Sequence, residues 1–330
     1  MRLVQLTGPG GRRVARVEEP KLRLLDTCAS IYDLASECLA NGVSLAQAID
    51  ERASVEVLDY NAIYAGESAW RLRPSADFPA EPARCLVSGT GLTHQASAQN
   101  RDAMHAVAQA VTDSTRMYRS GVQGGKPAPG ETGVAPEWFY KGSGLGLRAH
   151  NEPLVVPEYA EDGGEEPEVA GVYLIDVAGR PRRIGFTVGN EFSDHVFERK
   201  NYLYLAASKL RTCAIGPELV IGGGFDQVPG DVSVGRAGQT LWSRTIQTGE
   251  RTMCHSLANI EHHHFKFEFH RHPGDLHIHF FGADAFSFGD GVRLQEGDVM
   301  QVRFEGFGRA LRNPLLRVPG PSKLFAVEPI

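Results

Sequence analysis

Residues 165–191, EEPEVAGVYLIDVAGRPRRIGFTVGNE, contain two apolar, β-branched runs separated by a short polar segment. The runs Ala170–Asp176 and Arg183–Val188 predict two strands. Between them, Ala178-Gly179-Arg180-Pro181 is typical of a hairpin turn. A hairpin that turns at this point returns the end of its second strand to the start of its first. The residues that flank the two runs should therefore lie side by side.

Three carboxylates flank this predicted hairpin. Glu166 and Glu168 precede the first strand and, two residues apart in an extended chain, point to the same face. Glu191 follows the second strand and is expected at the same end. Like charges this close are unfavourable unless a cation lies between them, and the alternative for the first pair is a solvated acidic turn. Three carboxylates with open coordination positions suit Mg²⁺ or another hard cation and suit zinc or copper poorly.

Lys209 lies in an otherwise mostly apolar stretch, Asn201-Tyr202-Leu203-Tyr204-Leu205-Ala206-Ala207-Ser208-Lys209. A lysine in such a stretch either extends its ammonium group to the surface or is buried beside a charge. Burial beside a cation would lower the pKa of Lys209 toward the range that serves proton transfer.

Composition bounds the class of protein. The chain has 330 residues, 42% of them hydrophobic, and 34 Lys and Arg against 40 Asp and Glu give a net charge of −6. This slightly acidic charge argues against a protein whose main role is to bind nucleic acid or an anionic membrane. No run of 18 apolar residues predicts a membrane helix, and the N-terminal stretch lacks the apolar segment of a signal peptide. Five cysteines without a C-x-x-C pair fit a reducing compartment, and we expect a cytoplasmic protein.

The chain length predicts about two domains. Residues 1–80 are expected to form a small N-terminal α/β domain, residues 71–84 a Pro-rich linker, and residues 85–330 a larger, mainly β domain, which makes the fold class α+β. Strands are expected at Arg2–Leu6, Arg13–Val17, Cys85–Val87, His264–Phe269, Leu276–Phe281 and Asp298–Phe304, and helices at Asp33–Ala40, Ser44–Arg52, Gln99–Tyr118 and Leu203–Leu210.

A Gly/Pro-rich loop, Ser120–Pro136, is a candidate lid. Eight of the twelve histidines lie between His255 and His279. Consecutive strand residues point to alternating faces, so the run at 262–264 cannot converge on one zinc ion. We expect a polar strand face there, backed by Phe265, Phe267 and Phe269. His277 and His279 share a face and become functional only if that face lines a cavity.

Several motifs occur in the order found in one enzyme superfamily. They are Trp138-Phe139-Tyr140-Lys141-Gly142-Ser143, Glu166-x-Glu168, Gly189-Asn190-Glu191-x-Ser193, Ile215-Gly216-Pro217, Gly274-Asp275 and Gly297-Asp298-Val299-Met300. This set, spanning about residues 85–315, resembles the fumarylacetoacetate hydrolase superfamily. Within it, the run that ends at Lys209, 18 residues after Glu191, resembles the branch of 2-keto-3-deoxy sugar-acid dehydratases.

The resemblance implies a β-rich catalytic domain, a Mg²⁺ site in which Mn²⁺ or Ca²⁺ can substitute, and a homodimer. It assigns the metal to Glu166, Glu168 and Glu191, the last standing where the family usually has Asp. Substrate contacts are expected from Lys141 and Ser143, and from Gly282 and Ala283, where a Thr found in the family is missing. Lys209, His94 and His195 are the candidate catalytic residues, His195 being alternatively a partner of a metal ligand.

The resemblance also implies the reaction. We expect a Mg²⁺-dependent dehydratase of a 2-keto-3-deoxy sugar acid, with a pentonate favoured and 2-oxoglutarate semialdehyde as product, acting through a metal-stabilised enolate. The alternative is a C–C bond hydrolase of a 2,4-diketo acid. An acylpyruvase, an oxaloacetate decarboxylase and an inactive sugar-acid-binding protein are further alternatives. In each case the partner is a small 2-oxo acid.

Overall fold

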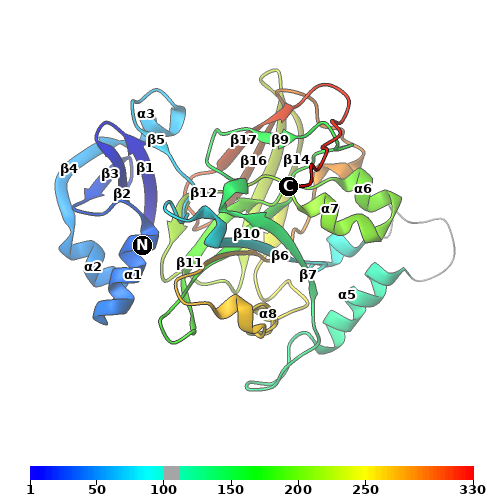
Figure 1. Cartoon of the computed structure of the whole chain (residues 1–330), viewed down its shortest axis with the longest axis horizontal. Coiled ribbons are helices and arrows are strands. Elements are labelled where there is room, and N and C mark those ends of the chain that lie inside the picture. Colours follow the sequence, from blue (N-terminus) through cyan, green and yellow to red (C-terminus); the bar gives the residue numbers. More distant parts are fainter. Residues whose placement is uncertain (100–111) are drawn as a thin grey trace.

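The computed structural model describes residues 1–99 and 112–330, and in these residues the chain is a mixed α/β structure made mostly of sheet (Figure 1). A large sheet and a smaller sheet pack face to face. The large sheet contains, in spatial order, β4 (Ala53–Asp59), β3 (Lys21–Leu25), β2 (Gly11–Glu18), β1 (Arg2–Gly8), β12 (Cys213–Val220), β11 (Pro181–Asn190), β10 (Pro167–Ile175), β15 (Leu276–Phe280), β6 (Cys85–Gly91) and β7 (Glu137–Ser143), with β5 (Arg71–Leu72) beside β1 and β8 (Leu147–Arg148) beside β12. The smaller sheet has the order β14 (Gln239–Thr248), β13 (Val228–Arg236), β16 (Val299–Phe304), β17 (Leu311–Arg317) and β9 (Leu154–Val156).

The helices are short. Those that lie wholly within the described residues are α1 (Ile31–Asn41), α2 (Leu45–Glu51), α3 (Tyr60–Ala65), α5 (Asp113–Gly124), α6 (His195–Lys200), α7 (Leu205–Lys209) and α8 (Leu257–Phe265), with 3₁₀ turns η1 (Pro82–Arg84), η2 (Gly144–Gly146), η3 (Tyr202–Tyr204), η4 (Glu268–Arg271) and η5 (Ser287–Asp290). None of the helices in the described part of the chain is both long and apolar enough to cross a bilayer.

Strand β10 supplies two hydrophobic cores through the alternation of its side chains. Val169 and Tyr173 pack into the core that includes β13, β16 and β17. Ala170 and Val172 enter a second core together with Ile31 and other residues of α1. The hairpin of β10 and β11 is thus covered on both faces, and every residue of β10 is buried.

The first strands continue the large sheet rather than forming a separate one. Strand β1 pairs with β12, with Arg2 opposite Val220. The predicted strands at 2–6 and 13–17 and the two predicted helices at 33–40 and 44–52 are present, with slightly different ends. Ser44 caps α2 as its sequence suggests, since its side chain accepts a hydrogen bond from the backbone N–H of Gln47.

The predicted strand at His264–Phe269 is wrong. The segment forms the end of α8 and the turn η4. Ser256 caps α8 by accepting from the backbone N–H of Asn259, and the buried residues of the helix recur at helical spacing. The phenylalanines differ accordingly, because Phe265 is buried whereas Phe267 is 37% and Phe269 73% exposed. The alternation of phenylalanine with polar residues from His264 to Phe269 imitates the pattern of a strand.

Helix α5 runs to Gly124, so the predicted loop at 120–136 begins with five helical residues and the open segment starts later. Of the helix predicted at 99–118, residues 100–111 lie outside the described residues, and residues 113–118 belong to α5.

A cluster of buried histidines lies between α8, η4 and strands β15 and β6. His264 Nε2 is 3.0 Å from His277 Nδ1, and the side chain of His279 hydrogen-bonds Ser88 and Thr90 at 2.8 Å each. His277 and His279 point to one face, as the sequence predicts, and that face is interior. Burial lowers the pKa of His277 and that of His279 to about 3, aided by the neighbouring His270.

These histidines predict loss of stability in acid. The folded pKa lies below the unfolded value of about 6.5, so the unfolded chain binds more protons between about pH 6.5 and pH 3. The free energy of unfolding should therefore fall as the pH falls through this window, by up to about 1.4 kcal/mol per pH unit for each such histidine.

Urea unfolding between pH 7.5 and 4.5 measures this slope. His279→Gln, which keeps polar atoms beside Ser88 and Thr90 but cannot take up the proton, should flatten it. His262→Gln, on the exposed face of α8, is the matched control and should leave the slope unchanged. An equal slope in the His279 variant would contradict the assignment.

Candidate metal centre

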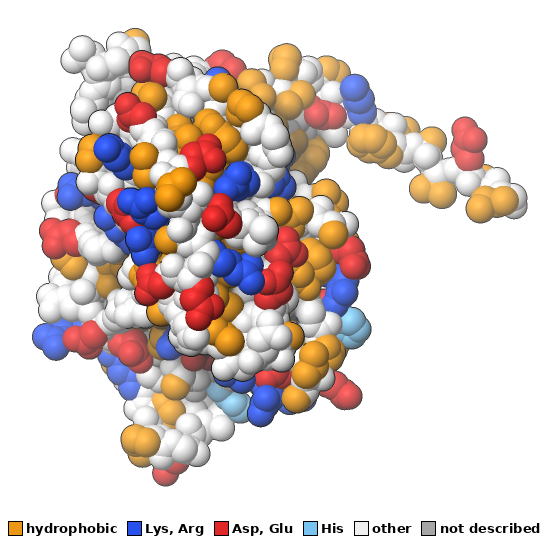
Figure 2. Space-filling view, turned by 90° about the vertical axis from the view of Figure 1, so that its left-hand side faces the viewer, with side chains coloured by type: hydrophobic (Ala, Val, Ile, Leu, Met, Phe, Trp, Pro, Cys, Tyr) orange, Lys and Arg blue, Asp and Glu red, His pale blue; other side chains and the backbone are white. Residues whose placement is uncertain are grey.

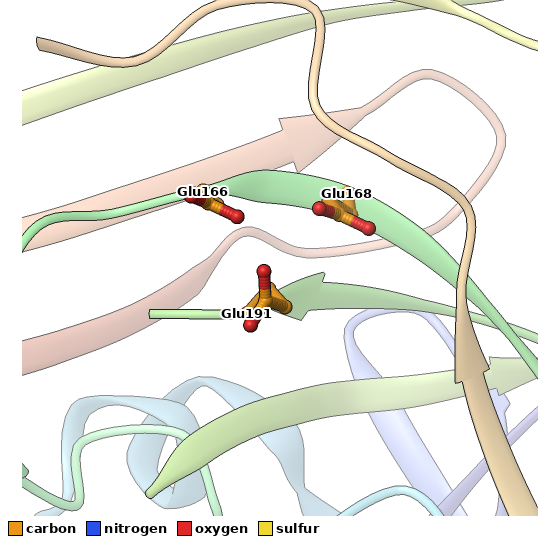
Figure 3. A group of neighbouring side chains, drawn as sticks. All are labelled: Glu166, Glu168 and Glu191. Atoms are coloured by element: carbon orange, nitrogen blue, oxygen red, sulfur yellow. The ribbon is translucent and has the colours of Figure 1, made fainter. Parts of the chain in front are cut away.

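The hairpin places the three predicted carboxylates together. Glu166 directly precedes β10 and Glu168 is its second residue, and Glu191 follows β11 and points toward them (Figure 3). A backbone hydrogen bond of 2.9 Å from Glu191 N to Glu166 O closes this end of the hairpin. One carboxylate oxygen from each residue lies within 4.8 Å of the other two, and all three side chains are buried.

Lys209, the last residue of α7, reaches into this group. Its Nζ is 2.6 Å from Glu166 Oε2, 2.6 Å from Glu191 Oε2 and 2.9 Å from Ser193 Oγ. The residue is 2% exposed, and the ring of Phe139 lies 4.7 Å from Nζ. Of the two alternatives open from sequence, the buried one is correct.

A second lysine balances the carboxylates. Lys141 on β7 is completely buried, and its Nζ lies 2.7 Å from Glu191 Oε1 and donates to the carbonyl oxygen of Phe192. Three carboxylates and two lysines leave one net negative charge if all are ionised. Lys141 thus pairs with a carboxylate, and its contact with substrate stays a prediction.

The three carboxyls have different pKa values, because burial and mutual repulsion affect each of them to a different extent. Burial and the charges of Glu191 and Glu166 hold the pKa of Glu168 well above its ordinary value. Burial, with Glu166 nearby, raises the pKa of Glu191 to about 7. The pKa of Glu166 lies well below its ordinary value because the charge of Lys209 and hydrogen bonds outweigh burial. A group that resists full ionisation in this way gains most from a bound cation.

His195 begins α6 and is fully buried. Its Nε2 lies 2.9 Å from Glu166 Oε1, and its ring stacks on Phe286 with the centroids 4.6 Å apart. Burial opposes the charged form, but the hydrogen bond and charge of Glu166 win and raise the pKa of His195. This contact with Glu166 is the one expected if His195 is the partner of a metal ligand, and its catalytic role stays a prediction.

The loop after β15 contacts the third carboxylate. Gly282 donates its backbone N–H to Glu168 Oε2 at 2.7 Å. Its φ is +96°, and an added Cβ would lie 2.0 Å from Thr93 Oγ1, so only glycine fits. Ala283 is buried beside Phe286 and Phe288. Of the predicted substrate-contacting residues, Gly282 therefore holds Glu168 in place.

Ser143 ends β7 and lines an open cavity of about 480 Å³ that Lys141 also borders. His94 lies beside Thr93, which contacts the start of the loop that contains Gly282. Its Nδ1 is 2.9 Å from Thr93 Oγ1, and Thr93 in turn donates to Phe281 O. Burial lowers the pKa of His94 to about 4. Among the described residues, no hydrogen bond joins His94 to the three carboxylates.

Sequence reasoning missed Glu137. This buried residue shares the inward face of β7 with Phe139 and Lys141, and its Oε2 accepts a hydrogen bond of 2.9 Å from Tyr202. It also missed Glu198, which accepts from Ser208 and lies 3.6 Å from Lys209 Nζ. Alternation along β7 could have shown Glu137, since residues 137, 139 and 141 lie on one face of any strand.

The donors suit a hard divalent cation. All are carboxylate oxygens, and opposite ligands lie about 4.2 Å apart around Mg²⁺ and about 4.8 Å apart around Ca²⁺. The observed spread of up to 4.8 Å needs little adjustment for either ion. Within the described residues this is the one group of three or more potential metal-binding side chains.

The chain thus carries a buried group of three carboxylates on a β-rich fold, with a lysine between two of them. A scan against family models found no match. Among curated proteins, a probable 2-keto-3-deoxyxylonate dehydratase of Haloferax volcanii is 28% identical over 179 residues, which are 52% of this chain and 58% of the relative. The match thus spans little more than half of either protein.

Solved structures share the fold over nearly the whole chain. The apo form of 2-keto-3-deoxy-D-arabinonate dehydratase has a TM-score of 0.72 at 18% identity, covering 97% of this chain and all of the other. The same dehydratase complexed with magnesium and 2,5-dioxopentanoate has a TM-score of 0.71, also at 18% identity with the same coverage. A 5-carboxymethyl-2-hydroxymuconate delta-isomerase of Mycobacterium smegmatis has a TM-score of 0.56 at 17% identity, covering 96% of this chain and all of the isomerase. These likenesses confirm the predicted mixed α/β fold made mostly of sheet, whereas its division into two domains stays a prediction.

Proposed function

We propose that this protein is a Mg²⁺-dependent dehydratase that converts a 2-keto-3-deoxy pentonate into 2,5-dioxopentanoate, which is 2-oxoglutarate semialdehyde. One observation carries the proposal: Lys209 Nζ lies 2.6 Å from each of two carboxylates in a buried group of three. This contact supports a role for Lys209 in proton transfer beside a proposed cation site. The names of the relatives, both for enzymes of 2-keto-3-deoxy pentonates, support this choice of substrate class.

The reaction needs a weakly acidic C–H bond to break. A bound Mg²⁺ would be held by Glu166, Glu168 and Glu191 and would supply positive charge where the 2-oxo oxygen of the substrate becomes negative. Mn²⁺ and Ca²⁺ are proposed substitutes, since both accept carboxylate oxygens.

The chain's own residues would handle protons and position. Lys209, in its neutral amine form, takes the C3 proton at Nζ and passes it to the C4 hydroxyl, which leaves as water and gives a C3=C4 double bond. Transfer of a C5 proton back to C3, followed by ketonisation of the C5 enol, gives the aldehyde and balances the loss of one water. His195 keeps Glu166 oriented, and Glu137 with Tyr202 offers polar groups for a substrate hydroxyl. Ser143, Ala283 and His94 remain proposed substrate or proton contacts on the surrounding loops.

The setting of the enzyme is part of the proposal. The five cysteines are free and buried, which supports a reducing cytoplasm. We propose a catalytic domain at residues 85–330 and an N-terminal domain at residues 1–80, joined through the large sheet, and a homodimer as the working form. A small 2-oxo acid is the proposed partner.

A substrate panel followed by proton NMR tests the function. It contains both enantiomers of 2-keto-3-deoxy-pentonate, a 2-keto-3-deoxy-hexonate and a 2,4-diketo acid, each with Mg²⁺ and with excess chelator. We expect loss of water and an aldehyde signal from one pentonate, with Mg²⁺ only. Pyruvate and a second fragment from the diketo acid, without dehydration of any sugar acid, would establish the hydrolase alternative instead.

A further inference from the structure

Three arginines line one cavity where β2 and the segment after β5 face the turn η2 and strand β8. Arg12 comes from β2, Arg73 follows β5, and Arg148 ends β8. The cavity has a volume of about 720 Å³, which is in the range of sites that hold small molecules. Two carboxylates, those of Asp77 and Glu152, are among the described residues that line it. Three positive and two negative side chains leave the wall with one net positive charge.

Two of the arginines lack a close carboxylate partner. Glu152 Oε1 lies 3.8 Å from Arg73 Nη1, which is beyond hydrogen-bond distance. Arg148 donates from Nη1 to the backbone carbonyl oxygens of Leu145 and Leu147 at 3.0 and 2.9 Å. It forms no ion pair with any residue that the structure describes. The uncompensated positive charge of the cavity therefore belongs to Arg73 and Arg148.

Most of the guanidinium donors are unused. Neither Arg12 Nε nor Arg73 Nε, both of which are buried, has a hydrogen-bond partner in the described part of the chain. A guanidinium group carries five N–H donors, and Arg12 spends one of them on Asp77 Oδ1 at 2.6 Å. The side chains of Arg12 and Arg73 are 22% and 35% exposed, so a ligand in the cavity can reach them.

The rest of the wall is largely apolar and rigid. Phe78 is buried and stacks on Tyr32 with the ring centroids 3.8 Å apart. Three prolines with fixed φ lie on the same wall: Pro79, Pro82 and Pro153. Such a wall accepts a carbon skeleton and holds its shape before a ligand arrives, which lowers the entropic cost of binding.

The charge around the cavity selects a small anion rather than a polyanion. Figure 2 views the molecule from the side that carries the first strands, and there Lys and Arg side chains are mixed with Asp and Glu. The whole chain has a net charge of −6. Nucleic acid needs an extended basic surface, and none is seen on this face. The unpaired positive charge is local to the cavity.

We propose that this cavity binds a small organic anion, in which a carboxylate or phosphate group on a short carbon skeleton is held by Arg73 and Arg148. The planar guanidinium group matches both oxyanions with paired N–H donors. One such group would offset the net positive charge of the wall. The proposal goes beyond the proposed function, because the three carboxylates of the candidate metal centre do not line this cavity. The turn η2 borders both this cavity and the one beside Ser143.

Calorimetric titration of the full chain in the presence of Mg²⁺ tests the site with two probes, glutarate and inorganic phosphate. We expect one of them to bind, and which one binds identifies the oxyanion. Arg73→Gln and Arg148→Gln should each raise its dissociation constant at least about tenfold, because each removes hydrogen bonds to a charged group. Arg71→Gln is the matched control. Arg71 is exposed on β5, donates to Trp70 O, lies outside the cavity and should leave the affinity unchanged.

Glu168→Gln separates this site from the candidate metal centre. It should leave the affinity for the anion unchanged, whether or not the protein dehydrates a pentonate, so the two proposals can fail independently. Loss of binding in Glu168→Gln with full binding in Arg73→Gln would place the anion at the metal and overturn the proposal. A full chain that binds neither glutarate nor phosphate would overturn it as well.

Chemical modification tests the same contacts without a substitution. Phenylglyoxal reacts with accessible guanidinium groups, and mass spectrometry locates the modified residues. The bound anion should slow the modification of Arg73 and Arg148 several-fold and leave that of Arg71 unchanged. Equal rates at Arg73 and Arg148 with and without the anion would show that it binds elsewhere.

Discussion

Lys209→Met should reduce turnover of the pentonate by at least about a thousandfold while the protein still binds Mg²⁺. General acid–base groups contribute about 10² to 10⁴ in rate, and Lys209 is the basic group held between the carboxylates. Methionine keeps most of the volume of the side chain and removes its charge, so packing against Phe139 is largely retained.

The same substitution should make stability depend on metal. Without Lys209, Glu166 and Glu191 face each other in a buried site with less positive charge, and breaking a buried ion pair costs about 3–5 kcal/mol. A divalent cation restores that charge. The melting temperature of the variant should thus rise more with Mg²⁺ than that of the unchanged protein, as thermal denaturation with and without chelator would show.

Lys200→Met is the matched control for these measurements. Lys200 lies on α6, is 54% exposed at its side chain and pairs with Glu161 at the surface, where an ion pair contributes little. It should leave turnover and the Mg²⁺ response unchanged. Retention of a tenth or more of the turnover in Lys209→Met would remove this lysine from the proposed chemistry, and loss of turnover without any Mg²⁺ response would leave it a structural role only.

The hairpin and its carboxylates could be predicted because they depend on local sequence. Apolar runs on either side of a Gly-containing turn fix the pairing of β10 with β11, and that pairing alone brings Glu191 to the start of β10. No long-range information is needed for this part of the site. The same reasoning placed the first two strands and helices, whose caps and turns are also local.

The partners of the carboxylates could not be predicted in this way. Gly282 reaches Glu168 from 114 residues away, and Lys141 reaches Glu191 from a strand at the far edge of the sheet order. Which strands become neighbours depends on the tertiary packing of the two sheets. The strand prediction at His264–Phe269 was wrong for a different reason. The alternation of aromatic and polar residues after His264 imitates a strand, whereas the cap at Ser256 starts a helix.

Glu168→Gln should act on the metal in the opposite sense to Lys209→Met. Glutamine has nearly the same shape, and its side-chain oxygen can still accept the hydrogen bond from Gly282 N–H. The change removes a negative charge that repels Glu166 and Glu191, so the metal-free protein should be as stable as before or more stable. It also removes a proposed ligand. Mutating a residue that only contacts a metal ligand typically lowers metal affinity about 10- to 100-fold. Removing the ligand itself should therefore lower Mg²⁺ affinity at least about 100-fold.

Calorimetric titration with Mg²⁺ and thermal denaturation together separate the possible results. We expect Glu168→Gln to lose both turnover and the Mg²⁺-induced rise in melting temperature, whereas Lys209→Met loses turnover and keeps that rise. Glu165→Gln is the matched control: Glu165 is buried like Glu168 and precedes it by three residues, but it accepts from Ser287 N and Oγ and lies outside the three-carboxylate group. It should retain Mg²⁺ binding. If Glu168→Gln bound Mg²⁺ with unchanged affinity, the cation would not lie among these three carboxylates, and the charge balance around Lys209 would need another explanation.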